Sequence, residues 1–121
     1  MYVIDNLVNG KRENVNKKAK LHILDITDLK SIEPIFKNAE YVFHLAALPR
    51  VQYSIEHPQE TNLVNVNGTL NVLTVSQKAG VKKVIYSASS SAYGDQSVMP
   101  LKENMPASPK SPYGLQKYIG E

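Results

Sequence analysis

The sequence predicts an α/β fold, a doubly wound parallel sheet that lacks its first strand and its Gly-rich phosphate loop. Short β-branched and aromatic runs alternate with helical patterns along the 121 residues, and such alternation is typical of a parallel sheet with crossover helices. Residues 41–47 form a continuous apolar run interrupted only by His44, as expected of a strand covered on both faces. Neither G-x-G-x-x-G nor the related G-x-x-G-x-x-G occurs anywhere in the chain.

Composition excludes several functional classes. The absence of cysteine rules out a disulfide framework and a thiolate zinc site, and it indicates a cytoplasmic protein. His22, His44 and His57 lack metal-ligand spacing, so we expect no metal. No apolar run approaches the ~20 residues of a membrane span, and the start of the chain lacks the pattern of a signal peptide. The net charge of +3 is mild, and its basic stretch has no interleaved aromatics, so no nucleic-acid partner is expected.

The first two predicted strands both end at an aspartate. Residues 2–4 form a strand that ends at Asp5, and residues 21–24 form one that ends at Asp25. A carboxylate at the end of a parallel strand is able to accept hydrogen bonds from both hydroxyls of an adenosine ribose. An ordinary strand-ending or turn-forming aspartate is an equally good reading of either position. Asp28 is then expected to cap a helix whose apolar positions Leu29, Ile32 and Phe36 follow helical spacing.

The middle of the chain predicts a strand, a loop and a long helix. The strand of residues 41–47 ends in two small alanines, which let a flat ligand approach the backbone, and its His44 is predicted to be structural rather than catalytic. Residues 48–57 are expected to be a loop. A helix then runs from Pro58 to a stop at Gly80, with one apolar stripe formed by Leu63, Val66, Leu70 and Leu73.

The last third of the chain contains the residues most able to take part in catalysis. A strand at residues 84–86 leads into the serine-rich segment 87–91, and a proline-spaced loop follows. Ser111 is a plausible N-cap and Pro112 a natural first residue of the next helix. Tyr113 and Lys117, four residues apart, then share one face of that helix. A nearby ammonium favours the phenolate and lowers a tyrosine pKa that is normally ~10, which suits a general base.

This ordered arrangement closely resembles the extended short-chain dehydrogenase/reductase family, also known as the NAD-dependent epimerase/dehydratase family. Within it, the chain is most similar to the nucleotide-sugar 4-epimerases that act on UDP-glucose or UDP-N-acetylglucosamine. The resemblance covers essentially the whole chain and implies a partial Rossmann-like fold. Residues 1–121 are then expected to be part of an NAD-binding domain, from its second strand to the start of the Tyr-x-x-x-Lys helix, with the substrate domain absent.

The resemblance also implies roles for individual residues. Tyr113 acts as the base, Lys117 binds the nicotinamide ribose, and Ser89 orients the substrate oxygen, with Ser90 a further substrate contact. Asp5 binds the ribose of NAD, and Asn65, the first residue of an Asn-x-x-Gly-Thr pattern, supports the active-site backbone and a proton path. The other implied cofactor-binding residues are Asn6, Leu7, Asp25, Ile26, Leu45, Ala46, Ala47 and Ser87.

Three alternatives stay open at this point. Dehydratases and decarboxylases of the same family carry acidic residues after the catalytic hydroxyl, where this chain has Ser90 and Ser91, so the epimerase is favoured. A non-enzymatic nucleotide-binding relative is favoured only by the missing phosphate loop. Lys11 and Arg12, just after Asp5, leave NADP open beside NAD. The parent enzyme is expected to be a homodimer that binds a UDP-sugar, and the isolated fragment is expected to be inactive.

Overall fold

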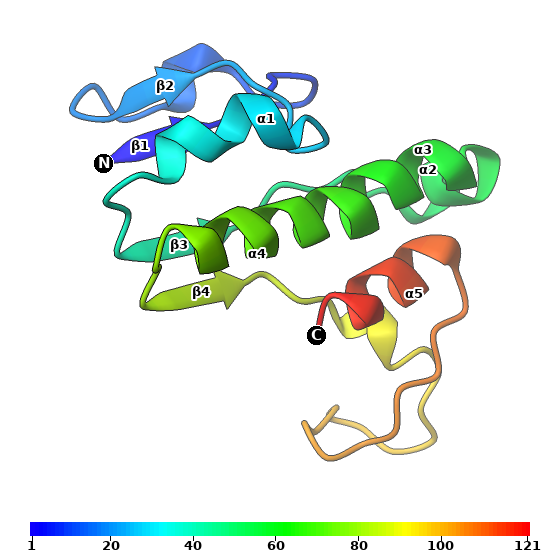
Figure 1. Cartoon of the computed structure of the whole chain (residues 1–121). Coiled ribbons are helices and arrows are strands. Elements are labelled where there is room, and N and C mark those ends of the chain that lie inside the picture. Colours follow the sequence, from blue (N-terminus) through cyan, green and yellow to red (C-terminus); the bar gives the residue numbers. More distant parts are fainter.

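Two pairs of parallel strands form the sheet structure of the computed structural model, which describes all 121 residues. In one pair β1 (Tyr2–Ile4) lies beside β2 (Lys20–His22), and in the other β3 (Tyr41–His44) lies beside β4 (Lys83–Tyr86). No ladder joins the two pairs, and Figure 1 shows them apart, with all strands pointing the same way. The predicted parallel α/β arrangement is confirmed.

A short helix follows β2 and ends early. α1 (Leu29–Ile32) continues into a 3-10 helix at Glu33–Phe36. The N-cap is Asp28, whose side chain accepts a hydrogen bond from the Ser31 N–H at 3.3 Å, as predicted. Pro34 lies in the 3-10 segment and has no N–H for an i→i−4 bond. We attribute the change from α to 3-10 geometry to this missing donor.

The long predicted helix is present, with a π-helical interruption. It consists of α3 (Pro58–Asn62), a π-helical segment (Leu63–Gly68) and α4 (Thr69–Lys78). Its end is the predicted one, because Gly80 follows with φ +69°, the left-handed conformation that stops a helix. The interruption falls on the Asn-x-x-Gly-Thr pattern, and π-helical turns are frequent at functional sites.

The predicted apolar stripe of this helix does not face the core. Leu63, Leu70 and Leu73 are 51%, 60% and 43% exposed. The buried face is built from smaller residues because the helix lies close to the loop after β2: a Cβ on Gly68 would stand 2.6 Å from Ile26 Cδ1. The extra residue in the π-helical turn also shifts the helical phase. The buried residues are Thr61, Asn65, Gly68, Thr69, Val72, Val75 and Ser76.

The expectation of a loop at residues 48–57 was wrong, because α2 (Val51–Glu56) lies there. The helix has no side-chain cap, so its sequence carries no local start signal. It is stabilised by packing on the C-terminal helix: Ser54 is fully buried, and its hydroxyl accepts a hydrogen bond from the Tyr113 N–H at 3.0 Å.

The hydrophobic core lies on one side of the strands only. It contains Ile26, Ile32, Phe36, Val72 and Val75, which come from α1, α4 and the adjoining segments. On the opposite face, Tyr41 and Phe43 of β3 are 57% and 68% exposed. The expectation that residues 41–47 are covered on both faces is therefore not met within this chain, since none of its elements packs on that face.

The C-terminal helix α5 (Pro112–Ile119) begins as predicted, with Ser111 Oγ accepting a hydrogen bond from the Gly114 N–H at 3.1 Å. The loop before it extends away from the body of the molecule (Figure 1). It is fastened where the Ser108 N–H donates to the Ala92 carbonyl at 3.0 Å. None of the helices is both long and apolar enough to cross a lipid bilayer.

Candidate active site

The serine segment after β4 forms a 3-10 helix (Ser90–Ala92) that Ser89 caps. The Ser89 hydroxyl oxygen accepts a hydrogen bond from the Ser91 N–H at 3.2 Å. This contact fixes the hydroxyl and leaves its own proton available to a ligand. Ser87 and Ser90 are exposed, whereas Ser89 is half-buried, and all three lie beyond the end of β4.

Helix α5 packs tightly against this serine segment. A Cβ on Gly114 would stand 2.6 Å from the Ser91 carbonyl oxygen, so only glycine permits this approach of helix to backbone. The neighbouring Tyr113 is half-buried, and its amide is held by Ser54. Ser89, Tyr113 and Lys117, predicted to act together, thus lie on two segments in direct contact, and we refer to these three as the catalytic cluster.

Lys117 is buried against an aromatic ring. It is 3% exposed, and its Nζ lies 4.2 Å from the centre of the Tyr86 ring. Burial lowers the pKa of Lys117. Burial, and next the charge of Tyr113, raise the pKa of Tyr86. Tyr113 therefore lies within electrostatic reach of the ring over which Lys117 sits.

His44 is buried beside this cluster in a defined tautomer. Its Nε2 lies 2.8 Å from Thr69 Oγ1, and the Thr69 hydroxyl donates to the Asn65 carbonyl at 2.7 Å. Because the hydroxyl proton is committed to that carbonyl, Nε2 must donate to Oγ1. Burial, together with the charge of Lys117, lowers the pKa of His44 to about 4. The ring is neutral at pH 7 and has a structural hydrogen bond, in agreement with the structural role favoured for it.

Asn65, 1% exposed, connects three segments of the chain. Its Oδ1 accepts from the Leu48 N–H at 2.8 Å, and its Nδ2 donates to the Leu48 carbonyl at 3.1 Å and to Gln116 Oε1 at 2.8 Å. The Gln116 amide donates in turn to Thr61 Oγ1 at 3.0 Å. The π-helical segment, the backbone after β3 and helix α5 are joined by this buried network. Gln116, Thr61 and Ser54 were not anticipated, since nothing in the sequence pairs polar residues so far apart.

The other predicted residues gather where β1 and β2 end. The Asp5 carboxylate accepts from the Leu7 N–H at 2.7 Å, and Asn6 Nδ2 donates to Asp25 Oδ2 at 2.9 Å. A Cβ on Gly10 would stand 3.0 Å from Asp5 Oδ1, so the turn closes directly over this carboxylate. We call Asp5, Asn6, Leu7, Asp25 and Ile26 the strand-end cluster.

Asp25 forms a turn within that cluster. Its Oδ1 accepts from the Thr27 N–H at 2.8 Å and from the Thr27 hydroxyl at 2.7 Å. Burial alone would raise the pKa of Asp25, but the hydrogen bonds from Thr27 and Asn6 outweigh it and lower the pKa. The turn-forming reading of Asp25 therefore describes what its side chain does here. Asn71 completes the support by donating to the Ile26 and Thr27 carbonyls at 2.9 and 3.1 Å.

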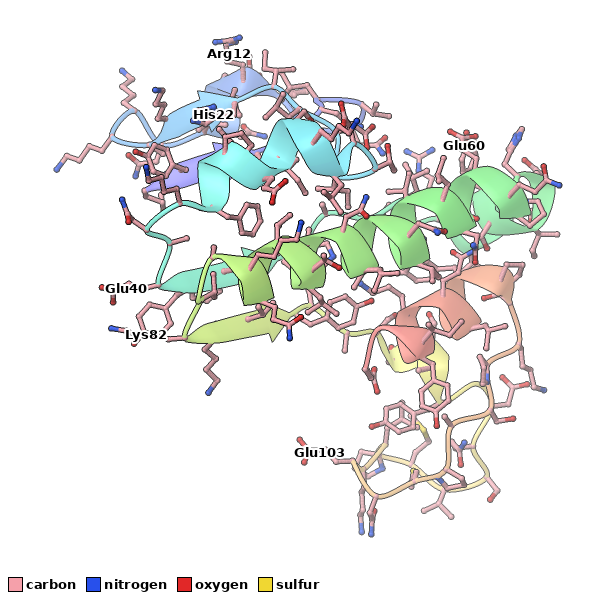
Figure 2. The ribbon with its side chains drawn as sticks, in the orientation of Figure 1. Arg12, His22, Glu40, Glu60, Lys82 and Glu103 are labelled. Carbon is pink, nitrogen blue, oxygen red and sulfur yellow. The ribbon has the colours of Figure 1, made fainter.

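The two clusters lie at the same end of the strands. In parallel strands the carboxyl ends meet at one edge, which is where open α/β sheets bind ligands. Leu45, Ala46 and Ala47 follow β3 there, and Leu45 is 69% exposed. The opposite edge carries the surface salt bridge between Glu40 and Lys82 at 3.0 Å (Figure 2). No hydrogen bond joins the two clusters directly, but Asn65 and Asn71 of the long helix contact segments beside each of them.

Three solved structures resemble this chain closely. A UDP-glucose 4-epimerase of Thermotoga maritima with UDP-glucose is 41% identical and superposes with a TM-score of 0.94 over 98% of this chain and 40% of its own. A UDP-N-acetylglucosamine 4-epimerase of Methanobrevibacter ruminantium is 40% identical, with a TM-score of 0.93 over 99% of this chain and 40% of its own. A Thermus thermophilus UDP-glucose 4-epimerase complexed with NAD is 35% identical, with a TM-score of 0.92 over 98% and 40%.

These neighbours confirm the Rossmann-like fold class, and the chain spans about 40% of their length. The resemblance seen in the sequence is supported independently by a family model. The model of the NAD dependent epimerase/dehydratase family matches residues 1–121. This chain belongs to the NAD-dependent epimerase/dehydratase family.

Proposed function

We propose that residues 1–121 form part of the NAD-binding domain of an enzyme that inverts C4 of a UDP-hexose or UDP-N-acetylhexosamine. The observation that carries this proposal is the contact of α5 with the serine segment, which gathers Ser89, Tyr113 and Lys117. Two of the 4-epimerases among the structural neighbours, one with UDP-glucose and one with UDP-N-acetylmuramic acid, support the substrate class. The substrate domain lies outside this chain.

The residues at the strand ends suit two parts of a dinucleotide, the adenosine and the nicotinamide ribose. The Asp5 carboxylate, beside the close turn at Gly10, suits the adenosine ribose, and it would repel a 2′-phosphate. Asn6, Leu7, Asp25 and Ile26 would hold the adenine. Lys117 suits the nicotinamide ribose, and Asn65 holds the neighbouring Gln116. Leu45, Ala46, Ala47 and Ser87, which follow β3 and β4, complete the proposed cofactor-binding residues. The sequence of this chain has no Gly-rich loop for the pyrophosphate.

The catalytic cluster moves one proton. Tyr113 as phenolate takes the proton of the sugar 4-hydroxyl, while the Ser89 hydroxyl donates a hydrogen bond to the same oxygen and orients it. Lys117 supplies a positive charge one helical turn from Tyr113 on α5. NAD, when bound, would supply the hydride acceptor and hydride donor for C4. Tyr113 then gives the proton back to the C4 oxygen, so the reaction has no net consumption of protons or electrons.

We also propose that the whole protein is a cytoplasmic homodimer, with the cysteine-free composition as the argument for the compartment. A groove of about 450 Å³ runs between α3, the π-helical segment and α5. Its Leu63, Leu115 and Ile119 are 51%, 49% and 55% exposed, and a second copy would cover them. Light scattering tests this: Leu115→Glu should yield monomers, and Val98→Glu in the outlying loop should not. Monomers without any substitution would contradict the proposal.

The activity is tested in a complete enzyme, made by exchanging the matching segment of the Thermotoga maritima 4-epimerase for residues 1–121. Given NAD and UDP-glucose or UDP-N-acetylglucosamine, it should form the C4 epimer, detected by proton NMR. A substrate labelled with deuterium at C4 should keep the label, because the hydride returns to the carbon it left. A 4-keto-6-deoxy sugar as the main product would support the dehydratase alternative, and loss of the label to water would contradict the mechanism.

A further inference from the structure

Lys117 is only 3% exposed, so most of its side chain is removed from water, and its ammonium is stabilised by any partner nearby. The salt bridges of the chain are formed by Lys78, Lys82 and Lys110, and Lys117 forms none. No hydrogen bond from its Nζ to a protein acceptor is present either. The close electrostatic partner of this ammonium is the face of the Tyr86 ring, with a distance of 4.2 Å from Nζ to the ring centre. At that separation a cation is attracted by the negative face of the ring.

The Tyr86 ring is itself held from several sides. The His44 ring lies 5.6 Å away between centres and is tilted by 44°. At the end of α5, a Cβ on Gly120 would stand 2.4 Å from the Tyr86 hydroxyl oxygen, so glycine at this position makes room for the ring. The Tyr86 hydroxyl also makes a long 3.5 Å contact to the Lys117 carbonyl. The ring is therefore fixed between β3 and the end of α5.

The His44 ring beside Tyr86 is neutral, so it adds no second positive charge near Lys117. Its Nε2–H is committed to Thr69, and its pKa is lowered to about 4 by burial and by the charge of Lys117. Glu121 is the acidic group that acts on Lys117, and it opposes the effect of burial on the Lys117 pKa. Lys117 therefore lies over the Tyr86 ring and near an imidazole that is neutral at pH 7.

We propose that Tyr86 is a positioning residue that holds the Lys117 ammonium by a cation–π contact and so fixes it beside Tyr113. Tyr86 touches neither substrate nor cofactor in this proposal. Its kinetic consequence rests on the proposed function, but the contact itself does not. From sequence, Tyr86 was predicted only to be a strand residue, because Lys117 lies far from it in the chain.

The test separates ring electrostatics from ring size, in the complete enzyme. Tyr86→Phe keeps the ring and should leave the Lys117 pKa, followed by NMR of labelled lysine, close to the native value. Mono-, di- and trifluorinated phenylalanine at position 86 weaken the negative face progressively at almost constant size. The Lys117 pKa should then fall stepwise by about 0.4 to 1.5 pH units in total, because the charged form loses its partner. The Lys117 signal is assigned with Lys117→Arg.

The turnover number should fall along the same series by about 2- to 10-fold, with KM nearly constant. A Lys117 pKa that stays unchanged or rises with fluorination would overturn the proposal and reduce Tyr86 to a space-filling role. The NMR titration of Lys117 needs no turnover, so it tests the cation–π contact even in an enzyme that has no epimerase activity. An enzyme without activity but with the stepwise pKa series would refute the proposed function and support the cation–π contact.

Discussion

Replacing Asn65 by leucine should destabilise the protein far more than the same change at a neighbouring exposed asparagine. Asn65 is 1% exposed and makes three side-chain hydrogen bonds, two to the Leu48 backbone and one to Gln116. Leucine has a similar size but satisfies none of these groups. A buried polar group left without its partner costs about 1–3 kcal/mol. Since Leu48 is only half-buried, we expect a total of about 2–4 kcal/mol rather than the sum of three full penalties.

The matched control is Asn67→Leu, two residues along the same π-helical segment. Asn67 is exposed, and its side chain accepts only a long 3.4 Å hydrogen bond from Asn62. The Asn67→Leu substitution should change the free energy of unfolding by no more than about 0.5 kcal/mol. Urea unfolding of the complete enzyme measures both, with the slope m unchanged if the variants stay two-state. Equal values for the two variants would refute the view that Asn65 holds the backbone after β3 and helix α5 together.

Three further predictions concern pH, cofactor choice and the isolated chain. The pKa of His44 is about 4 in the folded protein and 6.5 otherwise, so the unfolded state binds more protons between these values. The free energy of unfolding should fall by about 3 kcal/mol as pH drops from 6.5 to 4. His44→Gln should lose this part of the dependence of unfolding free energy on pH. An equal dependence in that variant would contradict the role of His44. The complete enzyme should bind NAD more tightly than NADP because of Asp5, and tighter NADP binding would assign the site to Lys11 or Arg12. The isolated 121 residues should aggregate or melt without cooperativity, and they should bind NAD weakly, since β1 and β3 have unpaired edges. Calorimetry that shows a cooperative transition and micromolar NAD affinity would refute this prediction.

Local signals in the sequence predicted much of this structure. Asp28 and Ser111 as N-caps and Gly80 as a helix stop depend on nearby residues, and the structure has them where expected. The predicted strands are present, but β2 ends at His22 rather than at residue 24, and β3 ends at His44 rather than at residue 47. The parallel pairing and the location of the aspartates and serines at strand ends follow from the alternation of elements. The family match agrees with the resemblance from which the roles of Ser89, Tyr113 and Lys117 were predicted.

Features that depend on tertiary packing were missed. Helix α2 has no cap, and what stabilises it is the buried Ser54 under α5, which local pattern does not reveal. The apolar stripe of the long helix was assigned to the core, whereas the close approach at Gly68 makes a face of small and polar residues the buried one. The partnership of Asn65 with Gln116 spans 51 positions, and the ring of Tyr86 becomes relevant only when α5 is placed over β4.

The proposed role of Tyr113 as the general base is tested by comparing two tyrosines on α5. In the complete enzyme, Tyr113→Phe should lower kcat by about 10²–10⁴, the usual contribution of a positioned base, with the melting transition preserved. Tyr118→Phe, on the same helix and 47% exposed, should leave kcat within about two-fold, because a surface hydroxyl takes no part. Near-normal turnover of Tyr113→Phe, or an equal loss in both variants, would contradict the account.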